Sequence, residues 1–347
     1  MLLIDSLYIN NSGGKVLLDY LVSELEKRGI NPYYLFDLRC INDFKKVPDE
    51  RKIFLKANLR NRHRWYKKNS NKFFSVFCFG NIPPTVRLKV PVYTYFHNVS
   101  LLKTPRNYGF RERLFKYLKR KYIKTISRNT SFYIVQSFFV KKLVCDVLNV
   151  DESYCIIFPF YKEFSNEMDS NSKKKEDAFL YVSNGNTHKN HDNLLTAWEL
   201  IAQQGIFPEL HLTITPQFEH LIKQITYLNN KGLKIFNHGF INPINLYKES
   251  QFIIYPSLTE SFGLGLIEGI MFNCDVIASD REYVYEVIKP SSVFNPENST
   301  SISTAVIDIL KKKNYSKSKI IVENKIDKLI QFIINASTHS PSPQIEP

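Results

Sequence analysis

Several features that define special classes of protein are missing from this chain. It has 347 residues but only 12 glycines and 16 prolines, which excludes a collagen-like or low-complexity chain. The five cysteines are an odd number without a Cys-x-x-Cys pair, so we expect free thiols in a reducing cytoplasm and no zinc site. The apolar stretches are far shorter than the ~20 residues of a membrane-spanning helix. No basic segment precedes the apolar N-terminus, so we expect no signal peptide.

Motifs of several enzyme classes are absent as well. The sequence contains no Asp-x-Asp, the usual carboxylate pair for a metal-bound sugar nucleotide, so we expect no metal and no other cofactor. It contains no Gly-x-Ser-x-Gly, no His-Glu-x-x-His and no phosphate-binding P-loop. These absences argue against α/β-hydrolases, zinc proteases and P-loop NTPases.

Positive charge is abundant but unevenly placed. The net charge is +14, and residues 1–160 carry 29 Lys and Arg against 12 Asp and Glu, whereas residues 161–347 carry 18 against 21. Lys45–Lys72 holds eleven basic and two acidic residues, and Lys103–Arg128 holds ten basic residues and one acidic residue. This asymmetry suggests that the first half faces a polyanion, such as a nucleic acid, an anionic membrane or an acidic lipid-linked substrate.

Short β-branched or aromatic runs alternate with amphipathic segments in both halves. This alternation predicts parallel sheets covered by helices on both faces, and hence an α/β chain with two Rossmann-like, doubly wound domains. Ligands bind such sheets at the carboxyl ends of the strands, so a cleft between the domains is the expected site. The expected strands are 2–8, 32–38, 73–79, 92–97, 131–136, 154–158, 179–183, 210–215, 233–237, 252–256 and 276–279. The expected helices between them are 15–28, 110–127, 138–148, 191–204, 218–229, 264–272 and 301–312.

Composition sets the expected domain boundaries. Residues 1–160 form the first domain and 178–315 the second, because 161–177 is a polar, serine- and charge-rich stretch that is typical of a linker. We expect a C-terminal helix within 316–335 that can pack back on the first domain. Residues 336–347 have the composition of a disordered tail.

The most informative segment is Tyr255–Phe272, YPSLTESFGLGLIEGIMF. A strand is expected to lead into a polar loop, after which Gly263 and Gly265 open a helix whose N-terminus suits a phosphate. Glu260 and Glu268 would repel a phosphate, so they indicate hydrogen bonds from sugar hydroxyls on either side of it. A dinucleotide loop is the alternative, but the spacing is Gly-x-Gly-x-x-x-Gly and lies in the second half. Another alternative is that Glu260 only caps the helix and that Glu268 lies on its solvated face.

Glu260 and Glu268 have the spacing of a Glu-x7-Glu motif, and the chain resembles the retaining glycosyltransferases of the group 1 (GT4) family. The resemblance is clearest over residues 178–310. It implies the GT-B architecture, in which two Rossmann-like domains face a cleft, and a nucleotide-sugar donor of the UDP, GDP or dTDP type. It also implies that Glu260 holds sugar hydroxyls at the reacting centre, that Glu268 holds the ribose, and that Gly263, Leu264 and Gly265 bind the donor.

Three further residues are assigned by this resemblance. Lys189 stands where the family has a lysine that binds the donor diphosphate, and a solvated loop lysine is the alternative. Asn184 stands where the family has an arginine, so one phosphate-binding cation is missing. His97, at the end of an expected strand, stands where the family places a histidine beside the donor sugar, and a structural histidine is the alternative.

Two loops complete the expected site. Gly13 and Gly14 allow a tight turn before a helix, near the acceptor or the diphosphate, and Lys15 could supply the missing cation. Gly239 and Phe240 lie in a loop that holds the nucleotide base in the family, through backbone groups.

These observations predict a metal-independent, retaining hexosyltransferase that acts on a polyprenyl-diphosphate-linked glycan in O-antigen, lipopolysaccharide or capsule biosynthesis. Alternatives are a sugar-nucleotide epimerase of the same fold, or a non-catalytic relative that binds nucleic acid or membrane. No signature of a nucleic-acid-binding fold is present, so we expect no nucleic acid as partner.

A basic amphipathic helix is expected at 110–127. Its apolar stripe, expected to pack in the core, leaves many cations free to face an anionic lipid surface. We therefore expect a cytoplasmic protein that is peripheral on the inner face of the cytoplasmic membrane. The stripe consists of Phe110, Leu114, Leu118, Tyr122 and Ile126, joined by Phe115 and Ile123.

Overall fold

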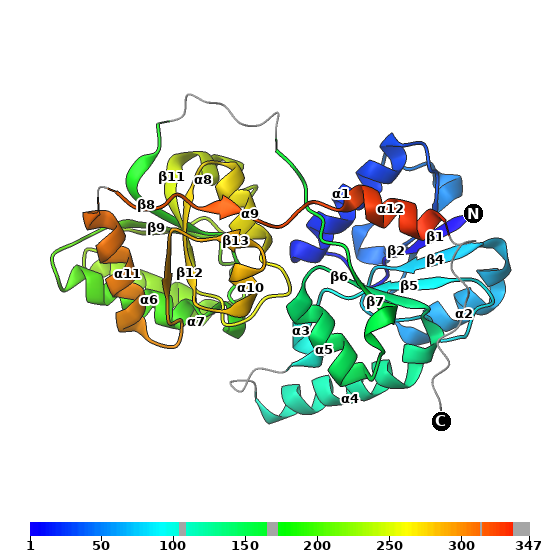
Figure 1. The fold of residues 1–347 in the computed structure, drawn as a ribbon. Coiled ribbons are helices and arrows are strands. Elements are labelled where there is room, and N and C mark those ends of the chain that lie inside the picture. The colour runs from blue at the N-terminus through cyan, green and yellow to red at the C-terminus, as the bar shows by residue number, and fades with distance from the viewer. Residues whose placement is uncertain (104–108, 165–172, 313, 336–347) are drawn as a thin grey trace. The chain divides into compact units, whose positions relative to one another are not determined.

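The computed structural model describes residues 1–103, 109–164, 173–312 and 314–335 (Figure 1). The chain divides into two compact units. The first comprises Met1–Lys162 and Glu323–Pro347, and the second comprises Glu163–Val322.

The first unit is built on a seven-stranded parallel sheet in the order β3-β2-β1-β4-β5-β6-β7. Its central strands are buried over their whole length, because helices cover both faces of the sheet (Figure 1). The strands are β1 (Leu2–Asp5), β2 (Tyr33–Asp37), β3 (Lys52–Leu55), β4 (Ser75–Cys78), β5 (Val92–Tyr95), β6 (Phe132–Val135) and β7 (Cys155–Ile157). The helices are α1 (Ser12–Lys27), α2 (Leu59–Asn69), α3 (Val99–Leu102), α4 (Phe110–Ile126), α5 (Phe138–Leu148) and α12 (Ile326–Ile334).

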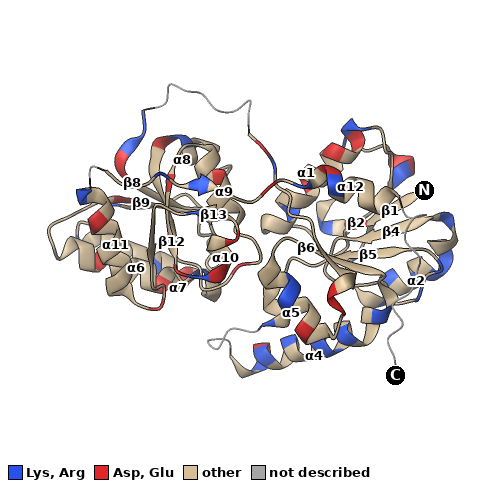
Figure 2. Cartoon of the chain, viewed as in Figure 1, with Lys and Arg blue, Asp and Glu red and all other residues tan. Residues whose placement is uncertain are grey.

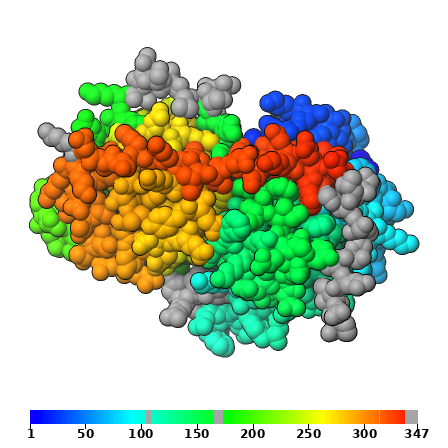
Figure 3. Space-filling model, viewed as in Figure 1, coloured from blue at the N-terminus to red at the C-terminus, as the bar shows by residue number. Residues whose placement is uncertain are grey.

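Helix α12, at the C-terminal end of the described chain, belongs to the first unit (red in Figure 3). The Ser75 hydroxyl of β4 donates a hydrogen bond of 3.0 Å to the Ile333 carbonyl, and Arg28 forms an ion pair of 2.5 Å with Asp327. The Phe332 ring packs edge-on against Tyr93. The chain therefore returns to its first sheet after completing the second.

The second unit is built on a six-stranded parallel sheet in the order β10-β9-β8-β11-β12-β14. Its strands are β8 (Lys175–Tyr181), β9 (Glu209–Leu212), β10 (Ile235–Asn237), β11 (Ser250–Tyr255), β12 (Asp275–Ser279) and β14 (Ser292–Phe294). A small antiparallel pair joins β13 (Ile288–Lys289) and β15 (Lys319–Ile320). The helices are α6 (His191–Ala202), α7 (Glu219–Asn230), α8 (Ile244–Glu249), α9 (Leu264–Met271), α10 (Glu282–Tyr285) and α11 (Ser299–Lys311).

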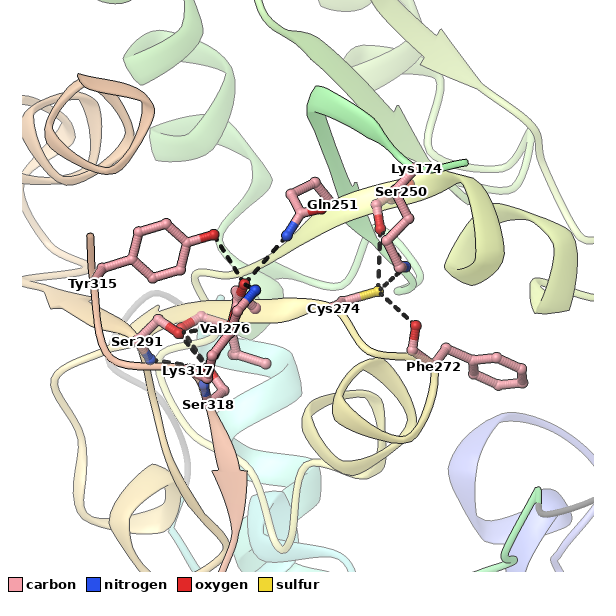
Figure 4. Close-up of polar contacts among 11 residues, drawn as sticks. Lys174, Ser250, Gln251, Phe272, Cys274, Val276, Ser291, Tyr315, Lys317 and Ser318 are labelled. Carbon is pink, nitrogen blue, oxygen red and sulfur yellow. Dashed lines mark hydrogen bonds and ion pairs between the residues drawn. The ribbon is translucent and has the colours of Figure 1, made fainter. Parts of the chain in front are cut away.

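A buried carboxylate at the start of β12 fastens the end of the second unit to its sheet (Figure 4). Asp275 is 2% exposed and accepts hydrogen bonds from the Tyr315 hydroxyl at 2.9 Å and the Lys317 amine at 2.8 Å. Ser291 and Gln251 donate to the same carboxylate. Because Asp275 lies at the amino end of its strand, away from the edge where such sheets bind ligands, this cluster is structural.

Within the basic segment Lys45–Lys72 the sequence patterns missed strand β3 and helix α2, and elsewhere they missed the edge strand β14 and the short elements β13, β15, α3, α8 and α10. Strand β3 is a half-buried edge strand, and α2 buries only Arg62 and Tyr66, so neither has a clear apolar period. Arg62 is 1% exposed, which removes one cation from the surface expected there. The expected linker 161–177 is too long at its C-terminal end, because strand β8 already begins at Lys175. Residues 165–172 of this linker and the expected tail 336–347 lie outside the described residues.

The expected packing of the basic helix is confirmed only at its C-terminal end. Most of the apolar stripe of α4 faces outward, with Phe110 80% exposed and Leu118 54% exposed. The stripe members Ile123 and Ile126 are buried, and the Arg120 guanidinium donates 3.0 Å to the Leu101 carbonyl. A stripe identifies residues that share a face, but not the face that packs.

Candidate active site

Two loops meet at the carboxyl edge of the second sheet through an ion pair. Lys189 follows β8 and Glu260 follows β11, and their amine nitrogen and carboxylate oxygen lie 2.6 Å apart. Both side chains are largely buried, at 17% and 12% exposure. The Leu258 N–H donates 2.8 Å to the His188 carbonyl, so the backbones of the two loops are joined as well. The structure thus brings together the two charged residues that the sequence assigned to the reacting centre.

Charge decides the protonation state of Glu260. Burial raises the pKa of this carboxyl, but the charges of Lys189 and His188 and the hydrogen bonds from Lys189 and Ser257 together outweigh burial, and the net effect lowers the pKa below its usual value. Glu260 is therefore ionised at neutral pH and accepts hydrogen bonds only.

Helix α9 opens directly after this loop. Gly263 has a φ of +85°, a left-handed conformation that favours glycine, and it precedes the first helical residue, Leu264. A Cβ on Gly265 would lie 3.2 Å from the Tyr255 ring, so the start of the helix fits tightly over the end of β11. Free N–H groups at this end of α9 favour an anion.

Glu268 lies farther along α9 and is held by a tyrosine. The buried Tyr247 hydroxyl donates 2.8 Å to its carboxylate. The carboxylate is half-buried, so the alternative of a fully solvated Glu268 does not describe it.

The remaining donor-side residues lie in loops of the same edge. Asn184 follows β8, and its side-chain oxygen accepts from the Asn186 N–H at 3.2 Å, which makes a local turn. Gly239, with a φ of +67°, follows β10, and the neighbouring Phe240 is 87% exposed.

Several residues that support this edge were missed from the sequence. The Tyr181 hydroxyl lies 2.7 Å from the Ser257 hydroxyl and donates 3.1 Å to the Lys189 carbonyl, so it ties both loops to β8. Asn190 has a φ of +64° and donates to the carbonyls of Pro256 and Pro296. The signal was available only as a tyrosine at a strand end and an asparagine before a helix, patterns that occur throughout the chain.

The predicted residues of the first unit lie at the carboxyl edge of its own sheet. Gly13 and Gly14 belong to the first turn of α1, which begins at Ser12, and not to an open loop. The Lys15 amine lies 2.7 Å from Asp19 and 3.1 Å from Asp43. Lys15 is therefore already neutralised by two carboxylates within its own unit.

His97 follows β5 and is clamped by Asn81, which follows β4. The Asn81 side-chain oxygen accepts from the His97 N–H at 2.7 Å, which places its amide nitrogen 3.4 Å from His97 Nε2. Nε2 therefore accepts and Nδ1 carries the proton. Burial lowers the pKa of His97 to about 4, so the ring is neutral at pH 7. A Cβ on Gly14 would lie only 3.0 Å from Nε2, so the turn and the histidine are in contact.

Neither a metal cluster nor a membrane-spanning segment is found in the described part of the chain. Within it, no group of three or more His, Cys, Asp or Glu side chains could hold a metal ion. No helix there has the length and apolar character that crossing a bilayer requires.

Comparison with known sequences identifies the second unit. Residues 163–327 match the family model described as "Glycosyl transferases group 1". Over 195 residues the chain is 25% identical to the O-antigen chain mannosyltransferase RfbU of Salmonella typhimurium, an alignment that covers 54% of this chain and 53% of the relative. The chain thus spans about half the length of that curated relative.

Comparison with solved structures extends the likeness to both units. Sucrose-phosphate synthase from Thermosynechococcus elongatus superposes with a TM-score of 0.69 at 15% identity, covering 89% of each chain. HepE from Anabaena, in complex with UDP-glucose, superposes with a TM-score of 0.66 at 13% identity, covering 97% of this chain and 94% of that chain. Residues 163–327 therefore carry the sequence pattern of group 1 glycosyl transferases, and the chain has the two-domain GT-B fold that its motifs predicted.

Proposed function

We propose that this chain is a retaining glycosyltransferase of surface polysaccharide biosynthesis, which moves a sugar from a nucleotide sugar to a lipid-linked glycan. The observation that carries the proposal is the 2.6 Å pair of Lys189 and Glu260 beside the open N-terminus of α9. The name of the curated relative supports an O-antigen context. UDP-glucose in the HepE structure supports a donor of the nucleotide-sugar class.

The proposed role of Lys189 and of the N-terminus of α9 is to stabilise the leaving diphosphate. When the glycosidic bond breaks, negative charge develops on the departing diphosphate, and Lys189 and the N–H groups at Gly263–Gly265 are placed to stabilise it. No arginine supports Lys189 in its loop, because Asn184 stands there and bonds its own backbone turn. Lys189 therefore carries more of the work than a lysine that shares the diphosphate with an arginine.

The two carboxylates accept hydrogen bonds from the sugars. Glu260 is ionised and fixed by Lys189, so it can hold hydroxyls of the transferred sugar without a change of protonation. Glu268 is oriented by Tyr247 and is assigned to the ribose. Catalysis is then mostly positioning and charge stabilisation, with the diphosphate helping to deprotonate the acceptor in a front-face displacement.

We assign the acceptor to the membrane surface. The excess positive charge lies in the first half of the chain, and a polyprenyl-diphosphate-linked glycan on an anionic leaflet supplies matching negative charge. The protein would then work as a peripheral protein on the inner face of the cytoplasmic membrane.

Thermal unfolding with UDP-, GDP- and dTDP-sugars tests the donor. A ligand at 100 times its Kd adds ~2.7 kcal/mol, a shift of several degrees. The donor that stabilises the protein should then be used in transfer assays with wild type, Glu268→Gln and Glu297→Gln, a surface glutamate of the same unit paired to Arg281. Glu268→Gln should lose transfer and bind donor more weakly, while Glu297→Gln keeps both. Equal turnover in the three proteins would overturn the assignment.

Chelation tests the proposed metal independence. Lys189 and the start of α9 supply the charge that a cation supplies in Asp-x-Asp enzymes, so transfer should continue in EDTA. Loss of transfer in EDTA, restored by Mg²⁺ or Mn²⁺, would contradict this part of the proposal.

A further inference from the structure

Helix α4 turns an apolar ridge away from the unit that carries it. Phe110 is 80% exposed, Leu114 46%, Phe115 57%, Tyr117 46% and Leu118 54%. At about 100° per residue, these five side chains fall within an arc of roughly 160°. Single exposed apolar residues are ordinary, but five on adjoining turns of one helix form a continuous patch.

The opposite side of α4 holds the helix in place. Ile123, about half a turn from the middle of the ridge, is 1% exposed and packs in a core cluster with Phe96 and Val99. The Lys116 amine donates 2.8 Å to the Ser100 hydroxyl, and Arg120 bonds the Leu101 carbonyl. Polar side chains thus fill part of the inner face while rings and leucines face outward, the reverse of an ordinary surface helix.

Lys and Arg recur along α4, as the blue segments of this helix in Figure 2 show. The Lys119 amine lies 4.4 Å from the centre of the Phe115 ring, and the Lys121 amine lies 5.1 Å from that of Tyr117. Each amine lies over the face of an aromatic ring, so positive charge and apolar surface adjoin on the same side of the helix. Glu112 is the single acid of the helix, against the bases Arg111, Arg113, Lys116, Lys119, Arg120, Lys121 and Lys124.

We propose that α4 is an interfacial anchor that lies in an anionic bilayer surface, with the apolar ridge entering the acyl region and the flanking cations at the lipid headgroups. Charge selects this occupant, because a bordering row of cations matches anionic headgroups as the ridge matches acyl chains. The inference rests on the proposed function, which puts the acceptor on a lipid. It adds an apolar contribution to the electrostatic docking that the charge alone suggests, and salt screens only the electrostatic part.

Vesicle sedimentation tests the anchor with one matched pair of variants. The ridge variant changes Phe110, Leu114 and Leu118 to Gln. The control variant changes Leu38, Ile41 and Phe74 to Gln, which are exposed apolar residues of the same unit at 43%, 57% and 47%. The probes are vesicles of phosphatidylcholine alone and of phosphatidylcholine with phosphatidylglycerol, at 0.1 M and 0.5 M NaCl.

Wild type and control variant should bind the anionic vesicles at low salt and keep part of the binding at high salt. The ridge variant should bind at least tenfold more weakly at low salt and lose the salt-resistant part entirely. Changing Lys119, Lys121 and Lys124 to Gln should instead remove the preference for anionic over neutral vesicles. In Leu118→Trp, brominated acyl chains should quench the added fluorescence.

Three results would overturn the anchor. The first is unchanged vesicle binding by the ridge variant, and the second is an equal loss of vesicle binding in the control variant. The third is a wild type that is a dimer and a ridge variant that is a monomer, because a second copy of the chain would then cover the ridge. The thermal shift with the nucleotide sugar separates this inference from the proposed function. A ridge variant that keeps the thermal shift with the donor but no longer binds vesicles supports the anchor. A wild type that binds vesicles but no nucleotide sugar also supports the anchor, and it contradicts the proposed glycosyltransferase function.

Discussion

The two units share one architecture and use it with different chemistry. Both are parallel sheets whose polar residues gather at the carboxyl edge. In the second unit that edge is charged, with Lys189 and Glu260 paired across two loops. In the first unit the edge presents a neutral histidine clamped by Asn81, and Lys15 is neutralised by two carboxylates.

The depth of the buried charges follows the same division. The first unit closes off an ion pair, here called the core pair, in which the Arg62 Nε donates 2.8 Å to Asp5, the last residue of β1, and the two side chains are 2% and 0% exposed. In the second unit the pair of Lys189 and Glu260 keeps 17% and 12% exposure. A pair closed off from solvent fixes structure, whereas a pair that solvent reaches can exchange partners with a substrate.

Breaking the core pair should give the largest effect on stability. Arg62→Met leaves the Asp5 carboxylate buried with only the Tyr66 hydroxyl and a backbone N–H as donors, so we expect a loss of ~3–5 kcal/mol in the unfolding free energy. Lys328→Met, which breaks an exposed pair with Glu323 in the same unit, should cost at most ~1 kcal/mol. Urea unfolding measures both, and equal costs would contradict the distinction between core and surface pairs.

Breaking the edge pair should instead act on the reaction. Lys189→Met removes the one cation expected on the diphosphate, so kcat should fall ~10²–10³-fold, the usual loss for a group that stabilises developing negative charge. Lys231→Met removes an amine with a similar 2.7 Å pair to Glu199 on the surface of the same unit, and should leave kcat unchanged. Steady-state transfer kinetics decide, and similar values for the two variants would remove Lys189 from the reaction.

How much the sequence predicts also differs between the units. In the second unit the strand, polar loop and glycines of Tyr255–Phe272 predict both the local structure and the carboxylates, and α9 was expected within one residue of its end. In the first unit the helix Phe138–Leu148 was predicted residue for residue, because its period is apolar and Ser137 caps it. Local patterns suffice where one face of a segment is apolar.

The remaining features depend on contacts between distant segments. No local pattern shows that Arg62 would pair with Asp5, 57 positions earlier, or that α2 would bury an arginine. The orientation of α4 has the same cause, because Ser100 and Leu101 of α3 accept hydrogen bonds from Lys116 and Arg120. The clamp between Asn81 and His97 likewise depends on which loops lie side by side at the end of the sheet.

The neutral clamp of the first unit can be turned into a charged one. In Asn81→Asp a carboxylate would face Nε2, favour the protonated imidazole and raise the pKa of His97 from about 4 by at least one unit. Titration of the His97 ring by NMR measures this rise, and the acid limb of the transfer profile should move to higher pH with it. Asn98→Asp places the same charge at an exposed neighbour and should change neither. An unmoved His97 would show that Asn81 does not control the ring.

The smallest expected effect concerns His191 of the second unit, a buried histidine without such a clamp. It is 2% exposed, and within the described residues neither ring nitrogen has a hydrogen-bond partner. Burial, helped by the charges of Lys189, His188 and His220, lowers its pKa to about 3. Below the unfolded pKa of about 6.5 the unfolded chain binds a proton that the folded protein refuses, so stability falls with pH from about 6.5 toward 3.

Replacing this ring with an apolar side chain should remove that loss. At pH 8 the melting temperature of His191→Leu should be close to that of wild type, and at pH 5 it should be higher. The expected gain in unfolding free energy at pH 5 is up to about 2 kcal/mol, at ~1.4 kcal/mol per pH unit below the unfolded pKa. The matched control is His63→Leu, in which the lost ring lies partly exposed and bonds Thr85 at 2.9 Å, so the melting curves should keep the wild-type slope between pH 8 and pH 5. A slope for His191→Leu that equals the slope of wild type would mean that the folded second unit accepts a proton on this ring, and the contrast with His97, whose Nε2 faces Asn81, would be lost.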